Sequence, residues 1–152
     1  MAKASFFRWG IFPFCPGFSG RLWWKFPPRP CSRRWGADEE HARRAAILHD
    51  CTKYYELPEQ LEICAKYGVE LDELEQKALK LLHAKTGAAI ARDIYGVDDE
   101  IYSAIWWHTT GHADMTLLEK IIYLADYIEP SRDFPGVEVL RKCVYEDLDR
   151  GL

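Results

Sequence analysis

Two adjacent side chains that can bind a metal follow a short aliphatic segment, in the stretch "AILHDCTKYYE" at residues 46–56. On a helix, His49 would share its face with three small residues, Ala42, Ala45 and Ala46. A lone histidine on an apolar face is most often a core residue with one hydrogen bond. Asp50 is harder to bury, because an unpaired carboxylate needs a cation, a metal or several donors. The pair alone leaves two interpretations open: a site that holds a cation, or the end of a helix where Asp50 hydrogen-bonds the turn.

Three more polar side chains lie on or beside apolar helix faces elsewhere in the chain: His83, His108 and Asp126. With His49 and Asp50 they bring imidazoles and carboxylates inward in one small domain. A divalent metal would neutralise the carboxylates and use neutral imidazoles as ligands. A nitrogen and oxygen ligand set without thiolate suits iron, manganese, zinc or magnesium and does not choose among them. His41 and His112 have polar neighbours, and we leave them outside this group.

The elements that must position these residues are helices. Apolar residues recur at helical spacing from residue 37 onward, and glycine or proline marks several helix ends. No run of β-branched residues alternates at period two. The sequence therefore predicts an all-α domain whose helices lie at 37–50, 57–68, 71–83, 84–96, 98–108, 115–130 and 136–148.

Composition limits the classes of function. The chain has 152 residues, 48% of them hydrophobic, and a formal net charge of −4. This balance gives no general case for nucleic-acid binding, and no stretch approaches the roughly 20 apolar residues that span a bilayer. The five cysteines have no paired spacing, which favours free thiols in a reducing cytoplasm.

The first 31 residues differ from the rest. Residues 1–36 hold seven Lys or Arg and no Asp or Glu, and their prolines and glycines interrupt any periodicity. We therefore divide the chain into an irregular basic and aromatic segment at 1–31 and a helical domain at 32–152. A frame-shifted reading of a GC-rich gene would give such a composition; the alternative is a genuine lineage-specific arm.

Several motifs carry a resemblance to a known family. "LHDCTKY", "LLHAKTGA", "IWWHTTG" and "TLLEKIIYLADYIEPSRDFPGV" resemble the HD superfamily of metal-dependent phosphohydrolases, and within it the YqeK-like symmetrical bis(5'-nucleosyl)-tetraphosphatases. The resemblance covers about residues 32–149. It implies an HD-domain helical bundle that is incomplete at both ends, because the family's first helix, with one more ligand histidine, and its last helical stretch have no counterpart here. We expect this loss to leave the alanine face of 42–46 uncovered and metal binding weak.

The resemblance also implies roles for individual residues. The metal ligands would be His49, Asp50 and Asp126, and the family's metal is iron, with manganese or another divalent ion as the alternative. Asp50 would also orient water. The residues that would stabilise or contact the substrate phosphates or nucleotide are His83, His108, Arg132, Asp133 and Lys53. Lys53 has an equally strong alternative interpretation as a solvated lysine in a turn.

The expected reaction is metal-dependent hydrolysis of diadenosine tetraphosphate to two ADP. Two alternatives stay open: another HD-type nucleotide phosphohydrolase or phosphodiesterase, and a catalytically impaired module that binds nucleotides. The expected partners are a dinucleoside polyphosphate or ADP, with no nucleic acid and no membrane, and a homodimer is left open. The expected compartment is the cytoplasm.

Overall fold

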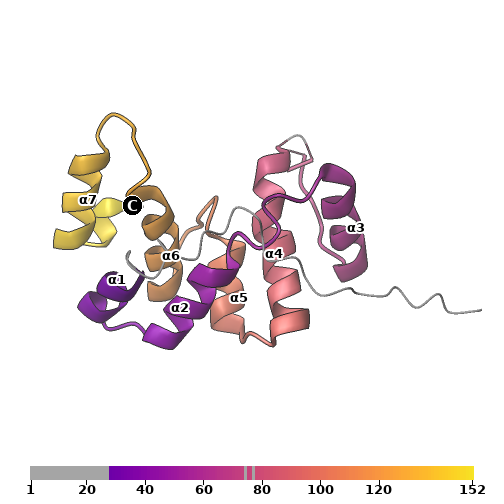
Figure 1. Cartoon of the computed structure of the whole chain (residues 1–152), viewed down its shortest axis with the longest axis horizontal. Helices are drawn as coiled ribbons and strands as arrows, with labels where there is room; N and C mark the ends of the chain where they lie inside the picture. Colours follow the sequence, from indigo (N-terminus) through magenta and orange to yellow (C-terminus); the bar gives the residue numbers. More distant parts are fainter. Residues whose placement is uncertain (1–27, 74, 77) are drawn as a thin grey trace, which may run out of the picture.

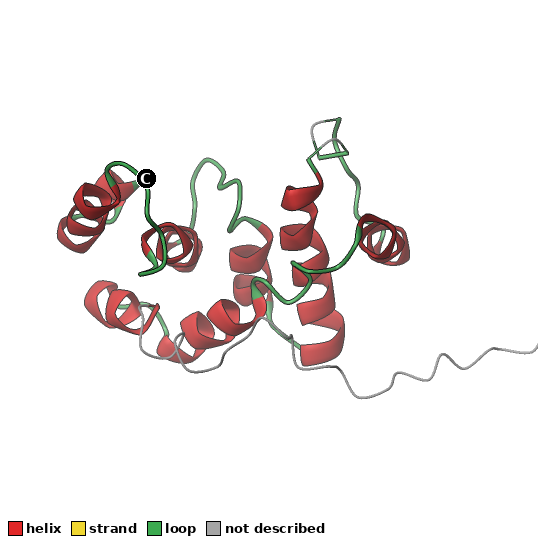
Figure 2. Cartoon of the chain, turned by 45° about the horizontal axis from the view of Figure 1, so that its top comes forward, coloured by secondary structure: helices red, strands yellow, loops and turns green. Residues whose placement is uncertain are grey.

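The computed structural model describes residues 28–152 apart from 74 and 77, and the side chains of 28–31 and 79 are also left aside. Within these residues all regular structure is helical, which confirms the predicted all-α class (Figures 1 and 2). The elements are α1 Pro28–Trp35, α2 Glu39–Leu48, α3 Leu57–Tyr67, α4 Leu79–Tyr95, α5 Asp99–Trp106, α6 Leu117–Ile128, α7 Val137–Glu146 and the 3₁₀ turn η2 Asp149–Gly151. Helix α1 begins before residue 32, where we expected the domain to start; residues 1–27 lie outside the described part.

Local side chains define where the helices begin. Asp38 precedes α2 and accepts a hydrogen bond from the backbone N–H of His41 at 2.8 Å. Asp98 does the same for α5, from the N–H of Ile101 at 2.9 Å. Thr116 and Glu119 form a capping box at the start of α6. Each bond satisfies a backbone donor that has no partner inside its helix.

One predicted pair of helices is wrong. We expected helices at 71–83 and 84–96, but a single helix, α4, covers Leu79–Tyr95. Asp72 and Glu75 instead exchange bonds with each other's backbone N–H, at 3.0 and 2.7 Å. The same reciprocal pair begins α6, so these bonds suit the first turn of a helix, but the described residues form only a turn here and α4 begins at Leu79. The long α4 follows because nothing between its two predicted halves breaks a helix.

The larger core joins α2, α4, α5 and α6. Its buried residues include Ala42, Ala45 and Ala46 of α2, which are 0%, 0% and 6% exposed. They pack with Ile101 and Ile105 of α5 and with other apolar side chains. The expectation that this alanine face would be uncovered is therefore wrong. Small side chains let α2 lie close to α5 and α6, which cover it (Figure 1).

A second core lies at the other end of the molecule, where α6, α7 and the end of α1 meet (Figure 2). Its buried members are Ile121, Leu124, Ile128, Val144 and Leu148. Helix α6 thus belongs to both cores, one on each face, which fixes its position relative to α2 and α5. Among the described helices, none is long and apolar enough to cross a membrane.

Candidate metal centre

Four of the residues singled out in the sequence meet where three helices converge. His49 follows the last residue of α2, Asp50 lies in the turn after it, His83 is near the start of α4, and His108 lies just beyond α5. We call these four residues the histidine–aspartate cluster. Helices α2, α4 and α5 contact one another, which brings the cluster together (Figure 1).

The three imidazoles are oriented by the backbone of their own helices. The Nδ1–H of His49 donates to the carbonyl of Ala46 at 2.8 Å, and that of His108 to Ile105 at 2.6 Å. His83 has the same arrangement with the carbonyl three residues before it, at 2.5 Å. Because a carbonyl oxygen only accepts, the proton is on Nδ1. Nε2 is therefore the ring atom that each histidine turns toward the cluster.

All three Nε2 atoms face the carboxylate of Asp50. His83 and His108 approach Oδ1 at 3.2 and 3.6 Å, and His49 approaches Oδ2 at 3.4 Å. The Nε2 atoms of His83 and His108 are also only 3.1 Å apart. Lone pairs do not attract each other or a carboxylate, so this arrangement is favourable only with protons or a metal cation between the atoms.

The electrostatics of the cluster favour a neutral His49 ring beside an ionised Asp50. Burial lowers the pKa of His49 to about 4, so this ring is neutral at neutral pH. Burial alone would raise the pKa of Asp50, but hydrogen bonds from His108 and His83, in the form that carries a proton on Nε2, and from Lys53 hold it well below its usual range. Neutral imidazole and anionic carboxylate are the forms that coordinate metals. The residues present therefore fit a divalent cation.

The tightest group of ligand atoms differs from the predicted set. His49, Asp50 and His108 each offer an atom within 4.8 Å of the others. Asp126, the third predicted ligand, lies on α6, where its carboxylate accepts a hydrogen bond from Arg132 at 2.7 Å. Its negative charge nonetheless acts on His49, since it favours the protonated ring. The structure therefore places Asp126 beside the cluster and His108 within it.

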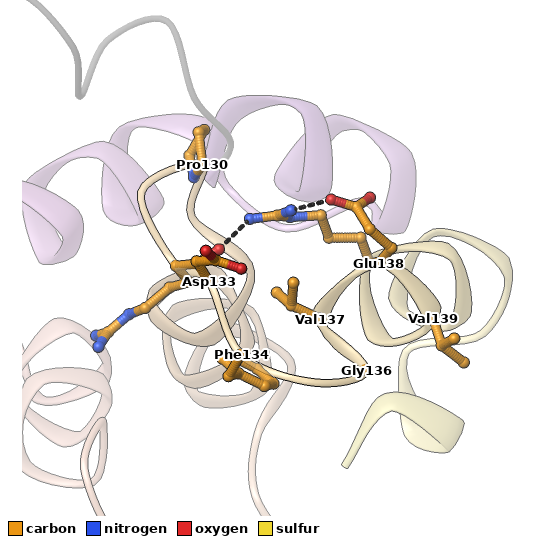
Figure 3. A pocket seen from close by; sticks show the side chains of 9 residues that line it. Pro130, Asp133, Phe134, Gly136, Val137, Glu138 and Val139 are labelled. Atoms are coloured by element: carbon orange, nitrogen blue, oxygen red, sulfur yellow. Dashed lines mark hydrogen bonds and ion pairs between the residues drawn. The ribbon is translucent and has the colours of Figure 1, made fainter.

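The remaining predicted residues lie around the cluster in two places. The Nζ of Lys53 is 2.6 Å from Oδ2 of Asp50, on an exposed side chain. Arg132 and Asp133 line a cavity of about 550 Å³ with the first residues of α7 (Figure 3). Arg132 thus connects this cavity to Asp126. His41 and His112 pair instead with Glu100 and Glu119, apart from the cluster as expected.

One residue of this region was missed in the sequence. Arg141 of α7 donates to the carbonyls of Ile128 at 3.0 Å, Glu129 at 2.8 Å and Arg132 at 3.1 Å. It thereby satisfies carbonyls at the end of α6, where Pro130 stops the helix, and it fixes the loop that carries Arg132 (Figure 3). The sequence does indicate through Pro130 that α6 ends here and leaves carbonyls that need donors. It does not indicate that Arg141 is the residue that donates to them.

Comparison with known proteins agrees with this geometry. A model of the HD domain family matches residues 29–131. The chain is 44% identical over 122 residues to the symmetrical bis(5'-nucleosyl)-tetraphosphatase of Bacillus subtilis strain 168, covering 80% of this chain and 65% of that protein. The same enzyme of Halalkalibacterium halodurans is 44% identical over 119 residues, covering 78% and 63%.

A solved structure supports the fold. The crystal structure of a predicted HD superfamily hydrolase involved in NAD metabolism from Clostridium acetobutylicum has a TM-score of 0.77 and 42% sequence identity, and the match covers 80% of this chain and 65% of that one. The chain thus spans less than two thirds of the length of each of these proteins. With its HD dipeptide between two helices, its converging imidazoles and a family match over most of its length, this chain belongs to the HD domain family.

Proposed function

We propose that this protein is a metal-dependent hydrolase that cleaves a dinucleoside tetraphosphate symmetrically, diadenosine tetraphosphate giving two ADP. The observation that carries the proposal is the convergence of three Nε2 atoms on one partly buried carboxylate. The similarity to enzymes named symmetrical bis(5'-nucleosyl)-tetraphosphatase supports the substrate class. In the reaction, water adds across the central phosphoanhydride, and each half leaves as a nucleoside diphosphate.

The proposed metal ligands are His49, Asp50 and Asp126, together with His108. His108 joins the set because its Nε2 lies within the tight group of ligand atoms. Asp126 stays in the set because its carboxylate can exchange Arg132 for a metal. A bound divalent cation would lower the pKa of water and neutralise charge on the phosphoryl oxygens. We propose iron as the native metal, from the family resemblance, with manganese as the alternative.

His83 is proposed to serve the substrate rather than the metal. It is 8% exposed, whereas His49 and His108 are 2% and 1% exposed, so it borders the open side of the cluster. Its Nδ1–H is held by a carbonyl, which leaves Nε2 as the atom that carries a proton to the departing phosphate. Asp50 orients the attacking water through its second oxygen.

The nucleotide is proposed to bind toward the cavity beside α7. Arg132 places a guanidinium between Asp126 and this cavity, where it can pair with phosphate. Asp133 lines the same cavity and offers a carboxylate to ribose hydroxyls. Lys53 contacts Oδ2 of Asp50 and supplies a second positive charge. A polyphosphate would thus meet two cations, one beside each aspartate.

The test measures metal content and products together. We expect anaerobically purified protein to contain iron and to convert diadenosine tetraphosphate to ADP alone. Asp50→Asn should lose the metal and lower the rate by at least about 100-fold, since even residues outside the ligand set cost about 10–100-fold. His41→Ala is the matched control, because His41 lies near the start of α2, at the opposite end from the cluster, and pairs with Glu100. It should change neither the metal content nor the rate.

Each other product pattern contradicts the proposal in its own way. ATP and AMP would show asymmetric cleavage, and turnover of other nucleotides alone would indicate another HD phosphohydrolase. ADP binding without metal or turnover would indicate a binding module. We also propose a cytoplasmic location, a homodimeric state and no affinity for nucleic acid, which fractionation, sedimentation and a nucleic-acid binding assay would test.

A further inference from the structure

A buried polar network lies directly behind the histidine–aspartate cluster. It consists of Thr52, Gln60 and Thr86, which are 0%, 2% and 0% exposed. Thr52 is in the same turn as Asp50, and Thr86 is on the same helix as His83. Buried polar side chains are retained only when they are hydrogen-bonded, so the bonds of this network show what it holds together.

Its bonds connect three separate elements. Gln60 of α3 donates from Nε2 to the carbonyl of Thr52 at 2.9 Å, and its Oε1 accepts from Thr86 of α4. The hydroxyl of Thr52 is 2.8 Å from that of Thr86 and 3.0 Å from the carbonyl of His83. The turn that carries Asp50 is therefore tied to the backbone of His83 itself.

A glycine permits this close approach. A Cβ on Gly87 would lie 3.3 Å from the carbonyl oxygen of His49 and 3.4 Å from Oγ1 of Thr52. The first distance is tighter than most Cβ contacts and the second is at the short limit of ordinary contact, so the carbonyl of His49 would have to move away from α4 by a few tenths of an ångström. Helix α4 and the turn after α2 therefore contact each other through the hydroxyl of Thr52 and the backbone of Gly87.

We infer that Thr52, supported by Gln60 and Thr86, is a positioning residue that sets the separation between Asp50 and His83. That separation is 3.2 Å between Oδ1 and Nε2, and it depends on how α4 lies against the turn. The inference rests on the proposed function, because it assumes that the cluster binds a metal whose ligands must be positioned. Catalytic geometry tolerates little displacement, since an error of about 1 Å can cost 10²-fold in rate.

The experiment compares three variants of the full chain by Mn²⁺ titration, thermal melting and hydrolysis of diadenosine tetraphosphate. Thr52→Val keeps the shape and removes the hydroxyl, and we expect it to weaken Mn²⁺ affinity by about tenfold or more. Thr52→Ser restores the hydroxyl and should restore the affinity. Val97→Ala removes a buried apolar contact near the far end of α4; it should lower the melting temperature and leave the affinity unchanged.

The outcomes separate the inference from the proposed function. Wild-type affinity in Thr52→Val would overturn the inference and leave the function standing. Weakened affinity in a protein that never hydrolyses the substrate would support the inference and overturn the function. Wild-type protein that binds no Mn²⁺ would overturn both. If Thr52→Val does not fold, Gly87→Ala tests the same separation without removing a hydrogen bond, and unchanged Mn²⁺ affinity there would overturn the inference.

Discussion

The two aspartates that the sequence singled out are equally exposed but have different neighbours. The side chains of Asp50 and Asp126 are both 20% exposed. Asp50 faces the Nε2 atoms of three histidines, whereas Asp126 faces the guanidinium of Arg132. An ion pair with a guanidinium offsets the cost of burying a carboxylate. Asp126 has such a partner, whereas Asp50 has from the chain only the ammonium of Lys53, which contacts Oδ2 from a side chain that is 40% exposed. The other oxygen of Asp50, Oδ1, faces His83 and His108 and is the atom left for a cation from solution.

The two surroundings also differ in how they are held. The imidazoles around Asp50 are tied to carbonyls of their own helices, three residues back in each case. Arg132 instead lies in the loop between α6 and α7, which Arg141 holds from the neighbouring helix. Groups on helices keep their geometry better than groups on loops. We infer that the Asp50 side is preformed and that the Asp126 side adjusts when metal or substrate binds.

The largest expected effect comes from removing one ligand on each side. His108→Ala and Asp126→Ala should each lose the metal and lower hydrolysis by at least about 100-fold, because each removes a proposed ligand. We expect metal-free Asp126→Ala to melt at a lower temperature than metal-free His108→Ala, since it leaves the partly buried Arg132 with only its longer ion pair, 3.6 Å to Glu129. Elemental analysis, melting curves and product assays measure the three quantities.

His112→Ala is the control, because this histidine pairs with Glu119 away from the cluster. If Asp126→Ala keeps its metal, then His49, Asp50 and His108 bind the metal without Asp126. Asp50 would then belong to the metal site, and Asp126 to the substrate site. If His108→Ala keeps its metal and loses only turnover, His108 contacts the substrate, as the sequence interpretation had it.

A smaller effect is expected from the residue that holds the loop. Arg141→Gln removes bonds to the carbonyls of Ile128, Glu129 and Arg132. Hydrogen bonds from charged groups each contribute about 1.5–3 kcal/mol, so the variant should be visibly less stable. Because the loop carries Arg132, KM should rise by roughly tenfold while kcat changes little. Steady-state kinetics and chemical denaturation test both.

Lys142→Gln is the matched control for Arg141→Gln. Its side chain is 79% exposed, on the same helix, and its one ion pair is 3.8 Å long. A fall in kcat with unchanged KM in Arg141→Gln would contradict the assignment, because it would place the loop at the chemical step rather than at binding.

The sequence predicted the cluster because its signals are local. His49 and Asp50 end an apolar face, and a buried carboxylate needs a cation wherever it lies. Spacing along α5 likewise placed His108 on the inner face. Spacing does not show which atoms meet across helices. The grouping of Asp126 with the ligands and of His108 with the substrate came from the family resemblance and stays a prediction.

The errors and omissions come from tertiary structure. The segment at Asp72 and Glu75 has helical spacing and the reciprocal bonds of a helix start, yet its described residues form a turn, and the helix begins only at Leu79. Arg141 and Thr52 act on carbonyls that are distant in sequence or belong to another element. A periodic pattern shows which face is apolar, but it does not show which donor reaches which acceptor.

The smallest expected effect concerns Lys53, whose Nζ is 2.6 Å from Asp50 on a side chain that is 40% exposed. Exposed ion pairs contribute only about 0–1 kcal/mol, so Lys53→Met should change stability little. Removing this cation also removes a competitor for Asp50, so metal affinity should stay level or rise slightly. If Lys53 faces the substrate phosphates, KM should rise about two- to fivefold at low salt, a change that corresponds to less than about 1 kcal/mol.

Salt separates the two interpretations of this lysine. Charge attraction at the surface is screened, so the rise in KM should disappear at about 0.5 M salt. Lys120→Met is the matched control, because its Nζ makes an ion pair of the same 2.6 Å length with Asp149, away from the cluster. An unchanged KM at low salt would make Lys53 a solvated lysine in a turn. The cations beside the two aspartates would then differ in kind, with only Arg132 serving the substrate.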